Sequence, residues 1–305
     1  MQPWDQLPFS LRQLQYVVAV AELGGFRRAA EACGVAQPSL SAQVAHVEAG
    51  LGVQLFERSA RGVRVTAVGA GLIARARQLL VSAADVRQSA TQHADPLLGT
   101  LRIGVIPTVC PYLLPEVAPA LREAFPRLTV IWSEDKTHAL MRDVHDGTVD
   151  AAILALDASM HRFDHVIIGV DPFVLAAPPR HPVVRERGPA TRRALDGAIV
   201  LLLEDGHCFR DQALALCGAS GATEGEWRAT GLATLVQMVG SGAGITLLPS
   251  LAVPIENRRG QLRIRRFKDP APSRTLILAW RKGAAHARAL TALGDRLATL
   301  WKRRR

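Results

Sequence analysis

Apolar residues recur every three or four positions through the first fifty residues, which is the spacing of helices that bury one face. The spacing predicts helices over 11–23, 26–33 and 37–49, the first two closed by glycines. Over 56–66 apolar and polar residues instead alternate around an Arg-Gly turn, which predicts a small two-stranded wing. Residues 1–66 are therefore expected to form one compact unit.

A stretch without proline follows, from about residue 67 to residue 92. Its apolar residues are spaced 4-3-4-3, the a/d seam of a coiled coil over about two heptads, at Leu72, Ala76, Leu79, Ala83 and Val86. The length and the seam favour an exposed helix that pairs with a second copy of the chain. The alternative is a core helix of a single domain.

Beyond Gly99 short apolar runs alternate with helical stretches. The expected strands are 101–106, 128–134, 151–156, 173–178, 198–203, 244–249 and 275–280. The expected helices are 112–124, 138–147, 209–217, 232–240 and 285–301. Continuous apolar strands between helices predict parallel α/β sheet covered on both faces. About 200 residues of this pattern predict two α/β lobes with a ligand cleft between them.

The composition, with 49% hydrophobic residues in a chain of 305, is typical of a soluble globular protein. No apolar run approaches the roughly 20 residues of a membrane span, so no membrane partner is expected. The N-terminus lacks a basic stretch followed by an apolar core, so it is not a secretory signal. We therefore expect the cytoplasm, where thiols stay reduced. Four cysteines do not make a disulfide framework, and any disulfide should be transient and functional.

The net charge of +10 is unevenly distributed. It is +3 over residues 1–93, −5 over 94–255 and +12 over 256–305, where the chain ends in a run of basic residues. Such a run is typical of a solvated chain end. Charge alone therefore does not identify the partner.

Two short helices joined by a tight glycine turn, the second with a polar outer face, form the helix-turn-helix pattern. Its Gln, Ser and Arg side chains are types that read base edges or hold phosphates. The candidates are Gln37, Ser39 and Ser41 for base edges, with Pro38 in the same first turn, and Arg27, Arg28, Arg58, Arg61 and Arg64 for phosphates. The alternative is a small helical domain with a polar surface. A dimer would duplicate the motif, as paired DNA half-sites require.

The run from Leu11 to Gly69 (LRQLQYVVAVAELGG…RVTAVG) resembles the signature region of LysR-type transcriptional regulators. The resemblance implies an α+β multidomain chain: a winged helix-turn-helix (1–66), a dimerising linker helix (67–94) and a regulatory domain (95–305) like periplasmic binding proteins. Its lobes would comprise about 97–170 with 276–305, and about 171–275. The implied partners are double-stranded promoter DNA, RNA polymerase and further copies of the chain, as a homodimer and a homotetramer. The chain is not expected to be an enzyme, and no cofactor or metal is expected.

Three further stretches, 106–119, 201–217 and 228–254, resemble the peroxide-sensing members of that family. In those members one cysteine reacts with hydrogen peroxide, the effector, and a second resolves it to a disulfide. The matching residues here are Cys208 and Cys217. The pocket residues implied by the same resemblance are Thr108, Thr137, His207, Asp211 and Arg274.

Three positions depart from that pattern. Cys110 stands where the family commonly has Gly, and adds a thiol that could compete for oxidation. Glu226 stands where some members have His. Ala36 replaces a Ser that often caps the recognition helix, at an expected cost of about 1 kcal/mol.

Peroxide oxidation needs a thiolate, and a helix N-terminus at Cys208 favours negative charge. His207 and Arg210 are expected to add positive potential, which acidic neighbours oppose. Hydroxyl and Arg donors such as Thr108, Thr137 and Arg274 suit the leaving hydroxide. If residues 208–217 are helical, the two cysteine Cα atoms lie roughly 13–14 Å apart, whereas a disulfide needs about 4.4–6.8 Å. A disulfide between Cys208 and Cys217 would therefore require the helix to unwind.

The sequence also allows other interpretations of the same residues. Two cysteines in an α/β lobe are commonly packing residues, and Cys33 is expected in the core beside the second helix. A zinc site at His207, Cys208 and Cys217 lacks a fourth ligand. The cleft of a LysR-type regulator can instead hold a small metabolite. A thiol peroxidase or a transport-type binding protein with a helical appendage is a further alternative.

Overall fold

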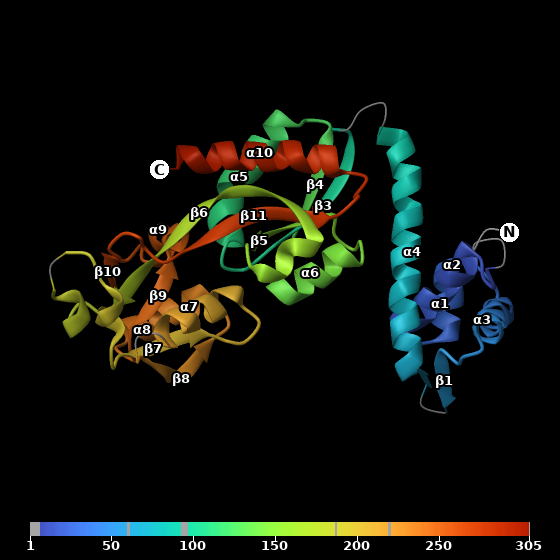
Figure 1. Cartoon of the computed structure of the whole chain (residues 1–305), viewed down its shortest axis with the longest axis horizontal. Helices are drawn as coiled ribbons and strands as arrows, with labels where there is room; N and C mark the ends of the chain where they lie inside the picture. Colours follow the sequence, from blue (N-terminus) through green and yellow to red (C-terminus); the bar gives the residue numbers. More distant parts are fainter. Residues whose placement is uncertain (1–6, 60–61, 93–96, 187, 219–220, 305) are drawn as a thin grey trace. The chain divides into compact units, whose positions relative to one another are not determined.

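The computed structural model describes residues 7–59, 62–92, 97–186, 188–218 and 221–304 (Figure 1). The chain divides into two compact units whose boundary lies between Thr91 and Gln92. None of the helices in the described part of the chain is both long and apolar enough to span a membrane.

The N-terminal unit begins with three helices, α1 (Leu11–Leu23), α2 (Phe26–Cys33) and α3 (Gln37–Leu51). Ser10 caps α1, since its hydroxyl accepts from the backbone N–H of Gln13 and the Gln13 side chain accepts from the backbone N–H of Ser10. Each helix ends at a glycine in the left-handed conformation, with φ of 64°, 65° and 68°. Ala36 makes no side-chain cap at α3, as the sequence indicated.

The predicted wing is an antiparallel pair, β1 (Phe56–Ser59) and β2 (Gly62–Val65). The Phe26 ring meets the Phe56 ring edge-on at 5.9 Å, so the wing packs on α2. The predicted inner face of α3 is buried at Leu40, Val44 and Val47, and that of α1 at Leu14 and Val17. Leu11, expected on the same face of α1, is instead 50% exposed at the helix start. The phosphate candidate Arg61 lies outside the described residues.

The long helix α4 (Ala67–Gln92) has the predicted bounds. Its seam divides between two environments. Ala76 is buried in the N-terminal core together with Ile73, whereas Leu79 and Val86 are 48% and 74% exposed. The second half of the seam therefore presents apolar side chains that the described chain does not cover.

The C-terminal unit contains a seven-stranded sheet in the order β10-β6-β11-β5-β3-β4, with β9 also paired to β6. The strands are β3 (Gly99–Val105), β4 (Leu128–Glu134), β5 (Ala151–Ala155), β6 (Phe163–Ala177), β9 (Thr246–Pro249), β10 (Arg263–Arg266) and β11 (Ser273–Arg281). β6 is continuous through 15 residues, and its first part pairs with β11 while its second part pairs with β9 and β10. It therefore connects two halves of the unit.

The expectation of a parallel sheet is confirmed for β3, β4 and β5 and is wrong for β6, β9, β10 and β11. β3 pairs with β4 and β5 in parallel, but β11 runs antiparallel to β5 and β6, and β9 and β10 run antiparallel to β6. The long return strands β6 and β11 produce the mixed sheet. Their polar alternation in Phe163–Pro172 hid half of β6 from a search for continuous apolar runs.

β7 (Ile199–Leu203) and β8 (Thr223–Ala229) form a separate parallel pair, beside the helix that contains Cys208 and Cys217. Helix α7 (Cys208–Gly218) follows β7 and packs on it, and α8 (Leu232–Gly240) packs on β7, β8 and β9. The other helices are α5 (Cys110–Ala124), α6 (Thr137–His145), α9 (Val253–Glu256) and α10 (Ala287–Arg303). Figure 1 shows α10 along the large sheet, where it packs on β6 and β11.

Candidate functional site

Cys208 is the first residue of helix α7. The turn from β7 contains Gly206 at φ 92°, a value that residues with a side chain rarely adopt. At a helix start the backbone N–H groups of the first turn have no partner within the helix and favour negative charge. The fold therefore places the half-buried Cys208 thiol at the N-terminal end of α7, the positive end of the helix dipole.

Cys217 lies on the same unbroken helix and is buried. Burial first, and then the charge of Glu224, raises the pKa of the Cys217 thiol, so it is protonated at neutral pH. Both thiols are free. Nine residues of helix separate the two Cα atoms by roughly 13–14 Å, about twice the longest span of a disulfide. The structure therefore supports the inference that bonding requires α7 to unwind.

Arg274 joins two of the candidate pocket residues. It is buried, and its Nη1 donates to Thr108 Oγ1 at 2.6 Å while Nη2 donates to the Thr108 carbonyl at 2.9 Å. Its Nε donates to the buried carboxylate of Asp171 at 3.0 Å. The guanidinium also lies 5.8 Å from the ring centroid of Phe209, the residue after Cys208. Thr108, Arg274 and the start of α7 thus form one packed group.

Three buried polar atoms here have no hydrogen-bond partner among the described residues: Thr137 Oγ1, His207 Nε2 and Gln212 Oε1. Buried polar groups in proteins are nearly always paired, and an unpaired one calls for a ligand or water. Gln212 was not predicted from the sequence. Its position four residues after Cys208, on the same helix face, is the signal that could have found it.

The expectation that His207 and Arg210 add positive potential is not supported. Burial first, and then the charge of Lys136, lowers the pKa of His207 below 6.5, so the ring is neutral at pH 7. Arg210 is buried against carboxylates: it binds Glu224 through two hydrogen bonds of 2.8 and 3.0 Å and Asp205 through one of 2.9 Å. Its charge is therefore compensated locally.

Asp211 is exposed in the first turn of α7, and no hydrogen bond or ion pair joins it to another pocket candidate within the described ranges. Glu226 is exposed on β8. Of the five predicted pocket residues, Thr108 and Arg274 are in direct contact, and Thr137 and His207 are both buried with one unpaired atom. Asp211 differs from these four residues in being exposed.

Cys110, at the start of α5, is half-buried. Burial, followed by a hydrogen bond to Glu134, raises the pKa of the Cys110 thiol to about 12. A protonated thiol is a poor nucleophile, so the expected competition for oxidation finds no support. Cys33 is half-buried against the N-terminal core, in line with the packing role expected for it.

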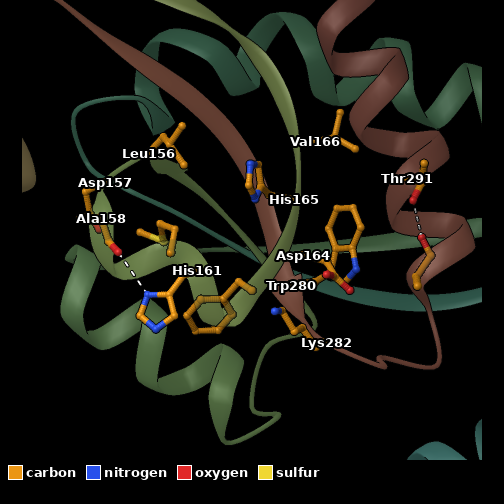
Figure 2. A pocket seen from close by; sticks show the side chains of 13 residues that line it. Leu156, Asp157, Ala158, His161, Asp164, His165, Val166, Trp280, Lys282 and Thr291 are labelled. Atoms are coloured by element: carbon orange, nitrogen blue, oxygen red, sulfur yellow. Dashed lines mark hydrogen bonds between the residues drawn. The ribbon is translucent and has the colours of Figure 1, made fainter.

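A cavity of about 760 Å³ lies elsewhere in the C-terminal unit, beside the start of β6 (Figure 2). Exposed polar residues line it, including His161, whose Nδ1 contacts the Ala158 carbonyl at 3.2 Å, and Lys282. None of the candidate pocket residues lines this cavity. Within the described ranges, no group of three or more His, Cys, Asp or Glu side chains is placed to hold a metal ion.

In the N-terminal unit, the polar face of α3 is accessible. Gln37, Pro38 and Ser39 are exposed, and Ser41 is half-buried because its hydroxyl accepts from Arg58 Nη1 at 3.1 Å. Arg58 also stacks over the Phe26 ring at 4.0 Å. These contacts hold the α3 face and the wing together as one surface.

Three further phosphate candidates lie on α2 and β2. Arg27 is exposed and pairs with Glu31 at 3.1 Å, while Arg28 and Arg64 are exposed. Exposed cations of this kind can exchange their partner for a phosphate group at small cost, since surface ion pairs contribute about 0–1 kcal/mol.

Comparison with known proteins finds a family match for the N-terminal region and another for the C-terminal region of the chain. Residues 11–70 match the family described as "Bacterial regulatory helix-turn-helix protein, lysR family", and residues 94–302 match the "LysR substrate binding domain". The chain belongs to the LysR family. This LysR-family chain is 44% identical over 277 residues to the hydrogen peroxide-inducible genes activator of Dickeya chrysanthemi, covering 90% of each chain.

Solved structures give the same result for the LysR-family chain. A full-length OxyR variant from Pseudomonas aeruginosa matches with a TM-score of 0.77 and 35% identity, covering 95% of this chain and 94% of that one. The reduced and oxidised forms of OxyR each match with a TM-score of 0.62, at 38% and 40% identity, over 68% of this chain and 97% and 98% of theirs.

Proposed function

We propose that this chain is a DNA-binding transcriptional regulator that responds to hydrogen peroxide through a reversible disulfide between Cys208 and Cys217. The observation that carries the proposal is the arrangement of α7: one thiol at the helix start, a second buried on the same helix, and unpaired polar atoms on His207 and Gln212, one residue before and four residues after the first thiol. The names of the relatives, which describe peroxide-inducible activators, support the same effector.

The chemistry proceeds in two balanced steps. The Cys208 thiolate attacks one oxygen of hydrogen peroxide, so that an S–O bond forms, the O–O bond breaks and hydroxide leaves, taking a proton to become water. The Cys217 sulfur then attacks the sulfenic acid, so that the S–S bond forms and the second oxygen leaves as water. Two electrons pass from the two thiols to one peroxide molecule.

The surrounding side chains have defined parts in the first step. Thr108 Oγ1 accepts from Arg274, so its own hydrogen is free to donate to a peroxide oxygen. Thr137 Oγ1 and His207 Nε2 supply unused hydrogen-bonding capacity at buried positions. Donors held in advance stabilise the leaving oxygen without reorganisation. Asp211 stays a candidate from the family resemblance alone.

The second step connects chemistry to shape. Unwinding α7 displaces buried residues that pack the C-terminal core, among them Phe209, Ala213 and Leu216. A packed core has discrete arrangements, so loss of one helix repacks its neighbours. We infer that this repacking changes how subunits meet and hence how the two DNA-binding units are spaced.

For DNA recognition we propose that α3 enters the major groove. Its base-edge contacts are Gln37, Ser39 and Ser41, with Pro38 beside them, and Arg27, Arg28, Arg58, Arg61 and Arg64 hold phosphates. The exposure of the α3 face and the Arg58–Ser41 contact support this assignment.

For assembly we propose the division into residues 1–66, 67–94 and 95–305, with lobes of about 97–170 with 276–305 and about 171–275. The exposed Leu79 and Val86 support a homodimer through α4. A homotetramer, promoter DNA and RNA polymerase complete the proposed partners. The proposed compartment is the cytoplasm, and the role is regulatory, not enzymatic.

The test is a promoter footprint with and without peroxide. Wild type and Cys33→Ser, a matched control outside α7, should change their footprint on oxidation. Cys208→Ser should bind DNA with the reduced footprint under both conditions. A footprint change that persists in Cys208→Ser would refute the assignment of the sensing thiol.

A further inference from the structure

Lys136 connects two chain segments that lie 68 residues apart in the sequence. Its ammonium group forms an ion pair with Glu204 and donates to the Asp205 carbonyl at 3.1 Å. Its side chain also lies against Gly206, where an added Cβ would come within 3.1 Å of Lys136 Cδ. One lysine thus contacts three consecutive residues.

Those three residues lead directly into the cysteine site. Only His207 stands between Gly206 and Cys208. On the other side, Lys136 immediately precedes Thr137, whose buried hydroxyl has no partner among the described residues. The ion pair therefore links the residue that precedes α6, the helix that begins at Thr137, to the loop that precedes α7, the helix that begins at Cys208.

The electrostatic consequences of this contact reach both neighbours. The hydrogen bond from Lys136 is the first cause that lowers the pKa of Glu204, so the carboxylate stays ionised at neutral pH. The same ammonium charge, after burial, lowers the pKa of His207. Lys136 thus binds the Glu204 side chain, and its charge also lowers the pKa of the nearby His207.

We propose that Lys136 is a positioning residue of the cysteine switch that holds the Glu204–Gly206 loop in place and thereby favours the dithiol form over the disulfide. This inference rests on the proposed function, because it presupposes that Cys208 and Cys217 bond.

The geometry gives the direction of the effect. Bonding must shorten a Cα separation of roughly 13–14 Å to about 4.4–6.8 Å. Cys217 lies among core residues, whereas Cys208 is half-buried at the end of a loop. Movement of Cys208 toward Cys217 pulls the adjoining loop away from Lys136. The ion pair is therefore made in the dithiol form and lost in the disulfide form.

The expected magnitude is modest because both side chains are partly exposed, 36% for Lys136 and 37% for Glu204. Ion pairs of this exposure shift an equilibrium about two- to fivefold. For a two-electron couple, a two- to fivefold change corresponds to about 10–20 mV. Removing the pair should lower the reduction potential of the disulfide by that amount, since the dithiol form loses a stabilising contact.

The experiment measures the potential of the full chain in buffers of reduced and oxidised dithiothreitol. The exchange is balanced: the protein disulfide takes two electrons and two protons from the dithiol, which closes to its own cyclic disulfide. Rapid alkylation and mass spectrometry then give the fraction of each form. The variants are Lys136→Met, Glu204→Gln and the double variant, with Lys136→Arg as the conservative replacement and the exposed Lys282→Met as control.

We expect Glu204→Gln to lower the potential, and Lys136→Met to lower it at least as much because it also removes the hydrogen bond to the Asp205 carbonyl. The double variant should lower the potential no further than Lys136→Met, and Lys136→Arg and Lys282→Met should match wild type. High salt should lower the wild-type potential and leave that of Lys136→Met unchanged, because it screens the pair. A potential for Lys136→Met and Glu204→Gln equal to that of wild type would overturn the inference. A wild type that forms no Cys208–Cys217 disulfide at any potential would instead overturn the proposed function, and this inference with it.

Discussion

The buried ion pair between Arg274 and Asp171 leads to a quantitative prediction for the free energy of unfolding. Their side chains are 0% and 1% exposed, and their charged atoms lie 3.0 Å apart. Solvent therefore screens neither charge. Asp171 also accepts from the backbone N–H of Leu251 at 3.0 Å, which leaves it well satisfied. The substitution Asp171→Asn removes the negative charge while it keeps the volume of the side chain.

The expected cost follows from the guanidinium that remains. A charge left buried without its partner destabilises a protein by about 3–5 kcal/mol, mostly because the group stays desolvated. Asp171→Asn should therefore lower the free energy of unfolding by about that amount. The exposed pair of Glu116 with Arg304 provides the control, and Glu116→Gln should cost less than about 1 kcal/mol.

Urea unfolding of the full chain, followed by tryptophan fluorescence, measures these differences. The buried Trp280 and Trp301 belong to the same unit as the pair. A second variant, Asp171→Leu with Arg274→Met, removes both charges and should recover about half of the loss. The reasoning is refuted if Asp171→Asn unfolds within about 1 kcal/mol of wild type, or if the double variant is less stable than Asp171→Asn.

Three further predictions follow from single residues. Cys110→Ser should keep the peroxide-induced disulfide. In the wild-type protein at pH 7, iodoacetamide should label Cys110 slowly because the pKa of its thiol is raised to about 12. Rapid labelling would contradict this. Ala36→Ser should raise the free energy of unfolding of the N-terminal unit by about 1 kcal/mol, because the extended Ala36 lacks a cap, while the mid-helix control Ala42→Ser should not. The lowered pKa of His207 means that the unfolded chain binds its proton more readily, so stability should fall as the pH drops below 6.5. Thermal unfolding from about pH 5 to 8 should show this fall in wild type and a smaller one in His207→Gln.

The N-terminal elements could be predicted closely because local signals coincide there. Apolar spacing, Ser10 as cap and the closing glycines fix α1 and α2 at their observed bounds, and Gly52 closes α3 two residues later than expected. The C-terminal unit was harder. β8 and β10 were missed because their sequences, TEGEWRA and RIRR, are mostly polar and contain no continuous apolar run.

The cysteine pair and the contacting residues Thr108 and Arg274 could be found from the sequence, but the ion pairs around them could not. Arg210 is one residue from the predicted site, and its compensation by Glu224 depends on a strand pairing that no local pattern reveals. The contact of Lys136 with Glu204 likewise requires two distant loops to meet. The charge of His207 was misjudged for the same reason, since burial is a property of the fold and not of the adjacent residues.

The central claim is that peroxide joins Cys208 to Cys217, and mass spectrometry of the thiols before and after one equivalent of peroxide tests it directly. We predict that all four cysteines are free at the start. After peroxide, one intramolecular disulfide should link the peptides that contain Cys208 and Cys217, with Cys33 and Cys110 still present as free thiols. A disulfide that involves Cys33 or Cys110, or four free thiols after treatment, would contradict the account.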